Sequence, residues 1–211
     1  MPDINSLLST EDIDVIGEIA NISIGTGAVA LNKLIGVPIK INTPIVTIDD
    51  KDSLMDKCTD AGVFVEITYT EGLEGSNTIL LKETDVKLIA GSMMHGIENC
   101  ENELKEELND MHLSAISEAM NQMMGSAVTA LSKMLDRKVN ITPPESSIFS
   151  IEDLIDFGGP LEYLGHCFVS VSLSMEIGDV TNSTIMQFYP LNMVHTICDA
   201  FKTAKGYEKK L

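Results

Sequence analysis

Two long stretches of the chain carry apolar residues at the spacing of an amphipathic helix. The first begins after Ser9, which has Asp12 three residues later as in a capping box, and stops at Gly36. Its apolar positions are Ile13, Ile16, Ala20, Ile24, Ala28, Leu31 and Leu34. The second runs through Leu113, Ile116, Met120, Met123, Ala127, Leu131 and Leu135, ending near Asp136. We expect two helices of about 25 residues each.

Strand patterning follows each long helix, and a shorter helix closes each half. The expected strands cover residues 37–47, 63–69, 77–81, 139–148, 167–175 and 183–188. One short helix is expected from Thr84 as N-cap to about Met94, and another from Pro190 in its first turn to about Lys202. The order α-β-β-β-α, written twice, predicts an α+β fold with the two long helices packed on a largely antiparallel sheet.

The two halves also match in sequence. Residues 14–46 align with residues 114–146 without a gap, which indicates an internal duplication. The identical pairs are Ile16/Ile116, Glu18/Glu118, Asn21/Asn121, Gly25/Gly125, Ala30/Ala130, Leu31/Leu131, Lys33/Lys133, Ile41/Ile141 and Pro44/Pro144. A weaker match joins residues 76–80 to 182–186. We therefore expect one domain, residues 1–211, built from two repeats at about 8–96 and 108–204 that are related by a pseudo-twofold axis.

The formal net charge of -18 argues against binding to nucleic acid or to an anionic membrane surface. Part of this charge lies between Glu98 and Asp110, a run that is typical of a solvated loop or helix face. No apolar run reaches the 18 or more residues of a membrane helix, so no membrane insertion is expected, and the N-terminus does not have the pattern of a signal peptide. These features favour a cytoplasmic protein.

The cysteines and histidines suggest no metal or disulfide chemistry. Cys58, Cys100, Cys167 and Cys198 lie far apart, without a CxxC pair, and are interpreted as reduced thiols. The histidines, at positions 95, 112, 166 and 195, lack metal-ligand spacing and are expected to be partly buried or on the surface. Gly25-Thr26-Gly27 falls in the middle of a predicted helix, so these small residues favour close helix packing over nucleotide binding.

The candidate chemistry lies on the polar side of the two long helices. Asp14, Glu18 and Asn21 fall on one stripe away from the apolar positions, and the second helix repeats the stripe as Ser114, Glu118 and Asn121. An exposed glutamate is ordinary on a single helix, but here the pair Glu/Asn is duplicated at identical spacing. An amide can orient a water for attack on a phosphoryl group, while a carboxylate can pair with a lysine of the partner.

The spacing of these residues resembles the active-site signature of the CheC/CheX/FliY family of bacterial chemotaxis phosphatases. The signature is Asp or Ser, three residues, Glu, two residues, Asn, twenty-two residues and Pro. It occurs here as Asp14, Glu18, Asn21 and Pro44, and again with the corresponding four residues, Ser114, Glu118, Asn121 and Pro144. The segments around both asparagines are most similar to the FliY branch of the family, and the resemblance covers a CheC-like domain without the C-terminal switch-ring domain usual in that branch.

This resemblance implies a protein aspartyl-phosphate phosphatase that acts on phosphorylated CheY within the flagellar motor switch. Asn21 and Asn121 would position the attacking water, and Glu18 and Glu118 would pair with a lysine of the receiver. Asp14 and Ser114 would support the contact, and Pro44 and Pro144 would shape the following strand. The chain would bind no cofactor, since CheY brings Mg²⁺. The implied partners are CheY and the switch proteins FliM, FliG and FliN-like proteins, at the cytoplasmic face of the flagellar basal body.

Two other functions remain open from the sequence. The chain could be mainly a scaffold component of the switch with weak activity, or a stand-alone CheC-type phosphatase of phosphorylated CheY. The late segments 169–173 and 188–191 are also similar to the middle domain of FliM, a switch protein.

Overall fold

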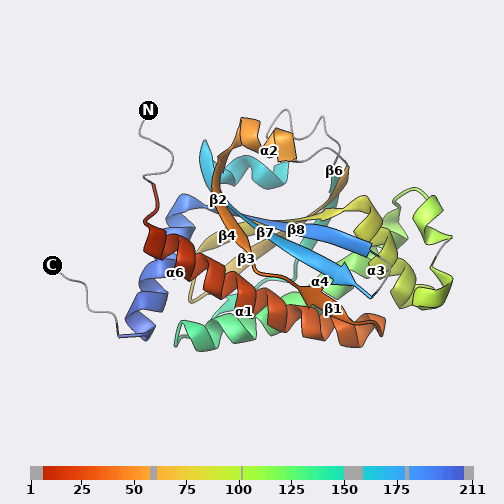
Figure 1. Ribbon diagram of the computed structural model, residues 1–211, viewed down its shortest axis with the longest axis horizontal. Coiled ribbons are helices and arrows are strands. Elements are labelled where there is room, and N and C mark those ends of the chain that lie inside the picture. Colours follow the sequence, from red (N-terminus) through yellow and green to blue (C-terminus); the bar gives the residue numbers. More distant parts are fainter. Residues whose placement is uncertain (1–6, 58–60, 101, 150–158, 179–180, 207–211) are drawn as a thin grey trace.

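The computed structural model describes residues 7–57, 61–100, 102–149, 159–178 and 181–206 (Figure 1). The helices are α1 (Thr10–Ile35), α2 (Lys51–Lys57), α3 (Glu83–His95), α4 (Asp110–Met134) and α6 (Leu191–Ala204), with 3-10 turns η2 (Ile97–Asn99), η3 (Glu103–Lys105) and η4 (Gly159–Leu164). The strands are β1 (Ile39–Ile41), β2 (Ile45–Asp50), β3 (Gly62–Glu71), β4 (Gly75–Lys82), β5 (Asn140–Ile141), β6 (Glu145–Phe149), β7 (Cys167–Ile177) and β8 (Thr181–Pro190).

The strands form one antiparallel sheet to which both halves contribute. The order is β1-β7-β8-β4-β3-β5, with β2 also paired to β7 and β6 also paired to β3. The first two strands of each half therefore pair with the long hairpin of the other half. The halves meet at the centre, where Ile79 of β4 lies opposite Gln187 of β8. The predicted α+β class, antiparallel sheet and pseudo-twofold arrangement are confirmed.

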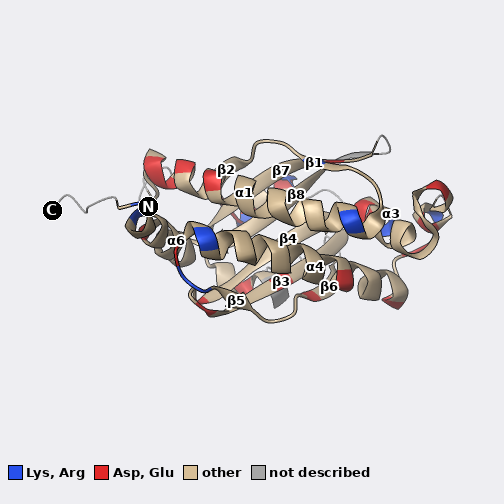
Figure 2. Cartoon of the chain, turned by 90° about the horizontal axis from the view of Figure 1, so that it is seen from below, with Lys and Arg blue, Asp and Glu red and all other residues tan. Residues whose placement is uncertain are grey.

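Two layers cover the sheet. Helices α1 and α4 lie side by side and antiparallel on one face, with α3 and α6 at their ends, and share the main hydrophobic core with that face (Figures 1 and 2). A smaller cluster on the other face includes Leu54 of α2, and Leu161 and Leu164 of η4.

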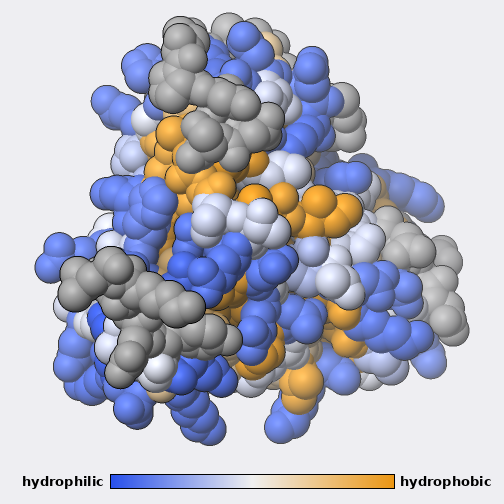
Figure 3. All heavy atoms as spheres, turned by 60° about the vertical axis from the view of Figure 1, so that its left-hand side comes forward, coloured by the Kyte–Doolittle hydropathy of each residue, from blue (hydrophilic) through white to orange (hydrophobic). Residues whose placement is uncertain are grey.

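Helix α1 is long and apolar enough to cross a membrane, but its apolar stripe is buried in the core. Hydrophilic side chains cover most of the flank near the chain ends, apart from a band of hydrophobic atoms (Figure 3).

The ends of α1 follow the sequence prediction. Ser9 Oγ accepts a hydrogen bond from the Asp12 backbone N–H at 3.1 Å, and the Asp12 carboxylate accepts one from the Ser9 backbone N–H at 3.2 Å. The helix ends at Gly36, whose φ of 75° is in the left-handed region that glycine adopts without strain. Local spacing was sufficient to predict both ends because capping depends on neighbouring residues.

Two sequence expectations about helix ends were wrong, and one short helix was not predicted. Thr84 is not the N-cap of α3: the helix already begins at Glu83, because β4 continues to Lys82 and runs directly into it. Pro190 occupies the N-cap position of α6 and not its first turn, since it still pairs with Phe168 in the sheet. The short helix α2 was missed; Asp50 stabilises its start by accepting from the Ser53 backbone N–H at 2.9 Å.

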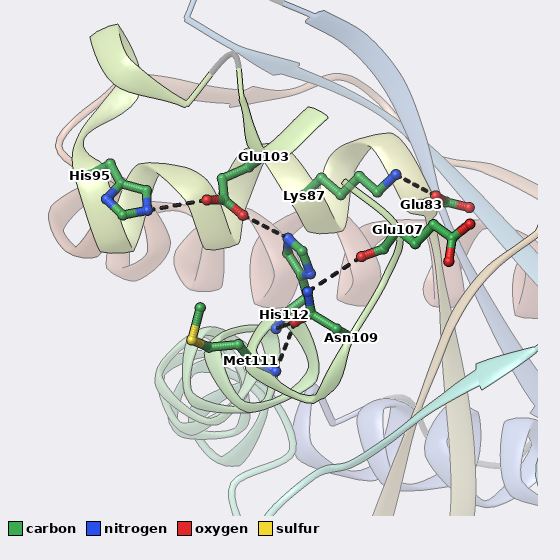
Figure 4. A network of polar contacts seen from close by, with 8 residues as sticks. All are labelled: Glu83, Lys87, His95, Glu103, Glu107, Asn109, Met111 and His112. Carbon is green, nitrogen blue, oxygen red and sulfur yellow. Dashed lines mark hydrogen bonds and ion pairs between the residues drawn. The ribbon is translucent and has the colours of Figure 1, made fainter. Parts of the chain in front are cut away.

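The acidic connector between the halves is only partly the solvated loop that was expected. Most of its glutamates are exposed, but Glu103 is half-buried, because its two carboxylate oxygens contact His95 Nε2 at 3.1 Å and His112 Nε2 at 3.0 Å (Figure 4). The His112 side chain is fully buried, which differs from the expectation of a surface or partly buried histidine. Glu103 therefore joins the end of α3 to the start of α4.

Candidate functional site

The structure places both predicted stripes on the outer side of the helix layer. Asp14, Glu18 and Asn21 are exposed on α1, on the side opposite its buried residues. The equivalent residues of α4, Ser114, Glu118 and Asn121, are exposed as well. In Figure 2, acidic residues gather towards the beginning of each helix and a basic residue lies towards its end. Since the helices are antiparallel, the two stripes lie towards opposite ends of the layer.

Gly17 and Ser117, which precede the two glutamates, lie against equivalent positions of the strands that follow Pro44 and Pro144. A methyl group on Gly17 would lie 3.7 Å from Val46 Cγ2, and in the second half Ser117 Oγ donates to Ser146 Oγ at 3.0 Å. These two contacts differ by the same offset as the aligned repeats. The match in sequence therefore corresponds to a match in three dimensions.

Pro44 and Pro144 lie behind the stripes. Each immediately precedes a strand, β2 or β6; Pro144 is buried and Pro44 is half-buried. They are therefore placed to direct the strand towards the sheet, where it contacts the helix near the glutamate.

Each asparagine lines a shallow hollow together with the lysine of its own repeat. The first hollow, about 970 Å³, contains Asn21 and Lys33, and the second, about 580 Å³, contains Asn121 and Lys133. The other residues of the first are Ile22, Gly25, Thr26, Val29, Ala30 and Leu34 of α1 with Gln122 and Ser126 of α4. The second lies between α4 and the segment 138–143. Neither the shared hollow of asparagine and lysine nor its apolar lining was predicted from the sequence, although Ile22 and Val29, two large apolar residues outside the predicted apolar stripe of α1, were a visible signal. Leu34, which was predicted on that stripe, is 38% exposed and lines the hollow.

The two copies differ in how their polar groups are engaged. Gln122 Nε2 donates to Glu118 Oε1 at 2.9 Å, whereas position 22 of the first copy is an isoleucine. Within the part of the chain that the structure describes, the side chains of Glu18, Asn21 and Asn121 have no hydrogen-bond partner. Their polar atoms are therefore available to a partner molecule.

The described residues include no group of three or more His, Cys, Asp or Glu side chains arranged to hold a metal ion. The three cysteines that the structure describes, at positions 100, 167 and 198, are free thiols, and Cys58 lies outside the described residues. Burial raises the pKa of the Cys198 thiol to about 12, which keeps it protonated. The exposed amide of each stripe can orient water and the carboxylate can bind a cation. The amide is not a nucleophile, and neither carboxylate has a neighbouring base or metal-binding group among the described residues that would activate it as one. Such a site is suited to chemistry in which the partner provides the electrophile.

Comparisons with known proteins point to one family. The model of the CheC-like family matches residues 111–148, which include Ser114, Glu118, Asn121 and Pro144. The flagellar motor switch phosphatase FliY of Bacillus subtilis is 33% identical over 210 residues; the match covers 100% of this chain but 54% of that protein, so the chain spans about half of its relative.

Solved structures give the same picture. The crystal structure of Thermotoga maritima FliY is 35% identical, with a TM-score of 0.84 over 93% of this chain and 98% of that one. A chain of the FliG–FliM complex from H. pylori, 14% identical, matches with a TM-score of 0.68 over 91% of this chain and 100% of that one, which shows a shared fold. From the sequence match, the structural match and the family signature together, the chain belongs to the CheC-like family, on the branch that contains FliY.

Proposed function

We propose that this chain dephosphorylates phosphorylated CheY by hydrolysing its aspartyl phosphate at two copies of one site. The observation that carries the proposal is the exposed pair Glu18/Asn21, repeated on the antiparallel helix as Glu118/Asn121. It is supported by the name of the Bacillus subtilis relative, a flagellar motor switch phosphatase. The proposed reaction class is hydrolysis of a phosphorylated aspartate.

In this mechanism the receiver docks on one stripe, and Asn21 or Asn121 reaches its phosphorylation site. The side-chain amide both donates and accepts hydrogen bonds, so it can hold a water in line with the phosphorus–oxygen bond that breaks. The water oxygen attacks phosphorus, the aspartate carboxylate of the receiver leaves, and inorganic phosphate carries the oxygen of the water away. Positioning the attacking water is the main contribution that an amide can make to the rate of hydrolysis.

The other residues have supporting roles. Glu18 or Glu118 pairs with the receiver's lysine and orients the two proteins, and Asp14 or Ser114, one turn earlier on the same stripe, supports that contact. Pro44 and Pro144 shape the strands behind the stripes. Mg²⁺ comes with the receiver, and this chain supplies no cofactor of its own.

The same proposal places the chain in the flagellar motor switch at the cytoplasmic face of the basal body. Its partners there would be FliM, FliG and FliN-like proteins. A scaffold role with weak activity is the second candidate, favoured by the fold shared with a chain of the FliG–FliM complex. A stand-alone CheC-type phosphatase is the third, and a switch-ring domain in the full-length protein would argue against it.

The test is phosphate release from phosphorylated CheY with Mg²⁺, comparing the unchanged chain with Asn21→Ala, Asn121→Ala and the double variant. Because removal of one preorganised polar group typically costs about a hundredfold or more in rate, the double variant should lose nearly all acceleration, and each single variant should lose only the share of its site. Asn192→Ala, which removes an exposed asparagine of α6, is the matched control and should keep full activity. If the unchanged chain does not accelerate phosphate release, the phosphatase function is contradicted and the scaffold role becomes the better candidate.

A further inference from the structure

Exposed apolar side chains gather beside one of the two asparagines. The large hydrophobic residues that are exposed among the described part of the chain are Ile22, Val29, Leu34, Ile45, Leu104, Met111 and Ile148. Three of these, Ile22 at 41% exposure, Val29 at 55% and Leu34 at 38%, line the same hollow on α1 as Asn21. A concentration of apolar area in one hollow is typical of a surface that another protein covers.

The duplication provides an internal comparison for this surface. The positions of α4 equivalent to Ile22, Val29 and Leu34 are Gln122, Thr129 and Met134. Thr129 Oγ1 donates to the Gly125 carbonyl at 2.8 Å, Gln122 binds Glu118, and Met134 is partly buried. The catalytic spacing is therefore the same in both copies, but Ile22, Val29 and Leu34 have no exposed apolar counterparts on α4. The apolar residues of the second hollow include Val128 and Val139, which are buried.

The charge at the end of the first hollow indicates the kind of partner. Lys33 is exposed and makes no ion pair within the described residues, in a chain whose formal net charge is -18. Lys33 lies about 18 Å from Asn21 along α1, so it would pair with an acidic side chain of the receiver outside the phosphorylation site. The hollow thus contains the Asn21 amide, an apolar surface and the Lys33 ammonium group, one after another along α1.

We propose that the α1 hollow is the main docking surface for the phosphorylated receiver, with an apolar segment of the receiver covering Ile22, Val29 and Leu34 and an acidic group near Lys33. The inference rests on the proposed function and extends it by assigning unequal roles to the two sites. At low receiver concentration most turnover passes through Asn21. The α4 site works chiefly when the receiver is abundant, because it offers less apolar area to bury and its glutamate is already engaged by Gln122.

The experiment exchanges the two surfaces while each site is measured alone. In the Asn121→Ala background, where only the α1 site acts, Ile22→Gln with Val29→Thr gives α1 the residues of α4. In the Asn21→Ala background, Thr129→Val makes the reverse exchange within the α4 hollow, and Gln122 is left unchanged because it lines the α1 hollow. The readouts are kcat and KM for phosphate release, and the Kd for receiver held in its phosphorylated form by beryllium fluoride.

The first exchange should raise KM and Kd about tenfold or more with kcat changed less than about twofold, because apolar burial contributes to binding and not to placing the water. The reverse exchange should lower KM at the α4 site. Leu104→Gln, which removes a side chain of η3 that is 40% exposed and lies outside both hollows, is the control and should leave both constants unchanged. Circular dichroism before and after heating checks that each variant folds.

The outcomes separate this inference from the proposed function. Normal phosphate release with an unchanged KM after the first exchange would overturn the docking surface and leave the phosphatase intact. Absence of phosphate release from the unchanged chain would overturn both. If the unchanged chain sediments as a dimer and the first exchange makes it monomeric, the hollow serves a second copy of this chain, and the receiver is not its occupant.

Discussion

Asp12 connects the first turn of α1 to the last helix of the chain. Its carboxylate accepts hydrogen bonds from Ser9 and forms an ion pair with Lys202 Nζ of α6 at 2.8 Å, with its side chain only 15% exposed. Burial acts to raise the pKa of Asp12, but the hydrogen bonds from Lys202 and Ser9 outweigh it and lower the pKa from 3.8 to about 2. The capping part of this arrangement was predicted from sequence, whereas the partner 190 positions away was not.

Because the folded-state pKa of Asp12 lies below its ordinary value, the ionised carboxylate stabilises the fold above about pH 4, and this contribution is lost as the pH falls towards about 2. This lowering of the Asp12 pKa corresponds to about 2.5 kcal/mol of stability. Asp12→Asn should lower the free energy of unfolding by about that amount at pH 7, and the difference from the unchanged chain should shrink between pH 4 and pH 2. Urea unfolding at a series of pH values measures this.

Asp56→Asn on α2, which removes another carboxylate at an exposed position, is the control for a general loss of negative charge. A difference between Asp12→Asn and the unchanged chain that stays constant down to pH 2 would contradict the assigned role of the Asp12 carboxylate.

At the scale of elements, the contact between α1 and α4 depends on small residues. A methyl group on Gly27 would lie 2.8 Å from both the carbonyl oxygen and Cγ of Met123, so this position admits only glycine without movement of α4. A methyl group on Gly25, two residues earlier, would meet nothing within 4 Å. The expectation that small residues here allow close helix packing is confirmed for Gly27, while Gly25 lines the hollow beside Asn21.

This difference predicts opposite effects of the same substitution. Gly27→Ala should destabilise the fold by about 1–3 kcal/mol because the added methyl group overpacks the helix contact. Gly25→Ala should be neutral or stabilise by up to about 1 kcal/mol, since alanine is favoured over glycine within a helix. Thermal and urea unfolding of the two variants measures this, and equal destabilisation by both would show that Gly27 has no special packing role.

At the scale of the whole molecule, the exchange of strands makes each half depend on the other. Val46 of β2 and Gln187 of β8 flank Val171 of β7, so a strand of the first half lies at the edge of the second half's hairpin. The same arrangement occurs where β5 and β6 pair with β3. The two halves therefore share one sheet and one core. A substitution that destabilises one half should lower the stability of the other half as well.

Val171→Ala should lower the free energy of unfolding by about 2 kcal/mol, because it removes two methyl groups from a fully buried position. Hydrogen exchange of the most protected amides should accelerate equally in β3 of the first half and β7 of the second, because one cooperative unit unfolds. Glu162→Ala, an exposed position of η4, should change neither. Faster exchange confined to β7 and β8 would show that the halves unfold separately.

Helices α1 and α4, the polar stripes on them and the duplication could all be predicted from the sequence, because they depend on spacing between near neighbours and on a constant offset along the chain. It also pointed to Glu18, Asn21 and their copies in the second half. The pairing of strands across the halves and the link from His95 through Glu103 to His112 became apparent only in the folded chain. The same holds for the hollow that Asn21 shares with Ile22, Val29 and Leu34. Such contacts join residues through space or depend on which surface stays uncovered, and no local pattern encodes either.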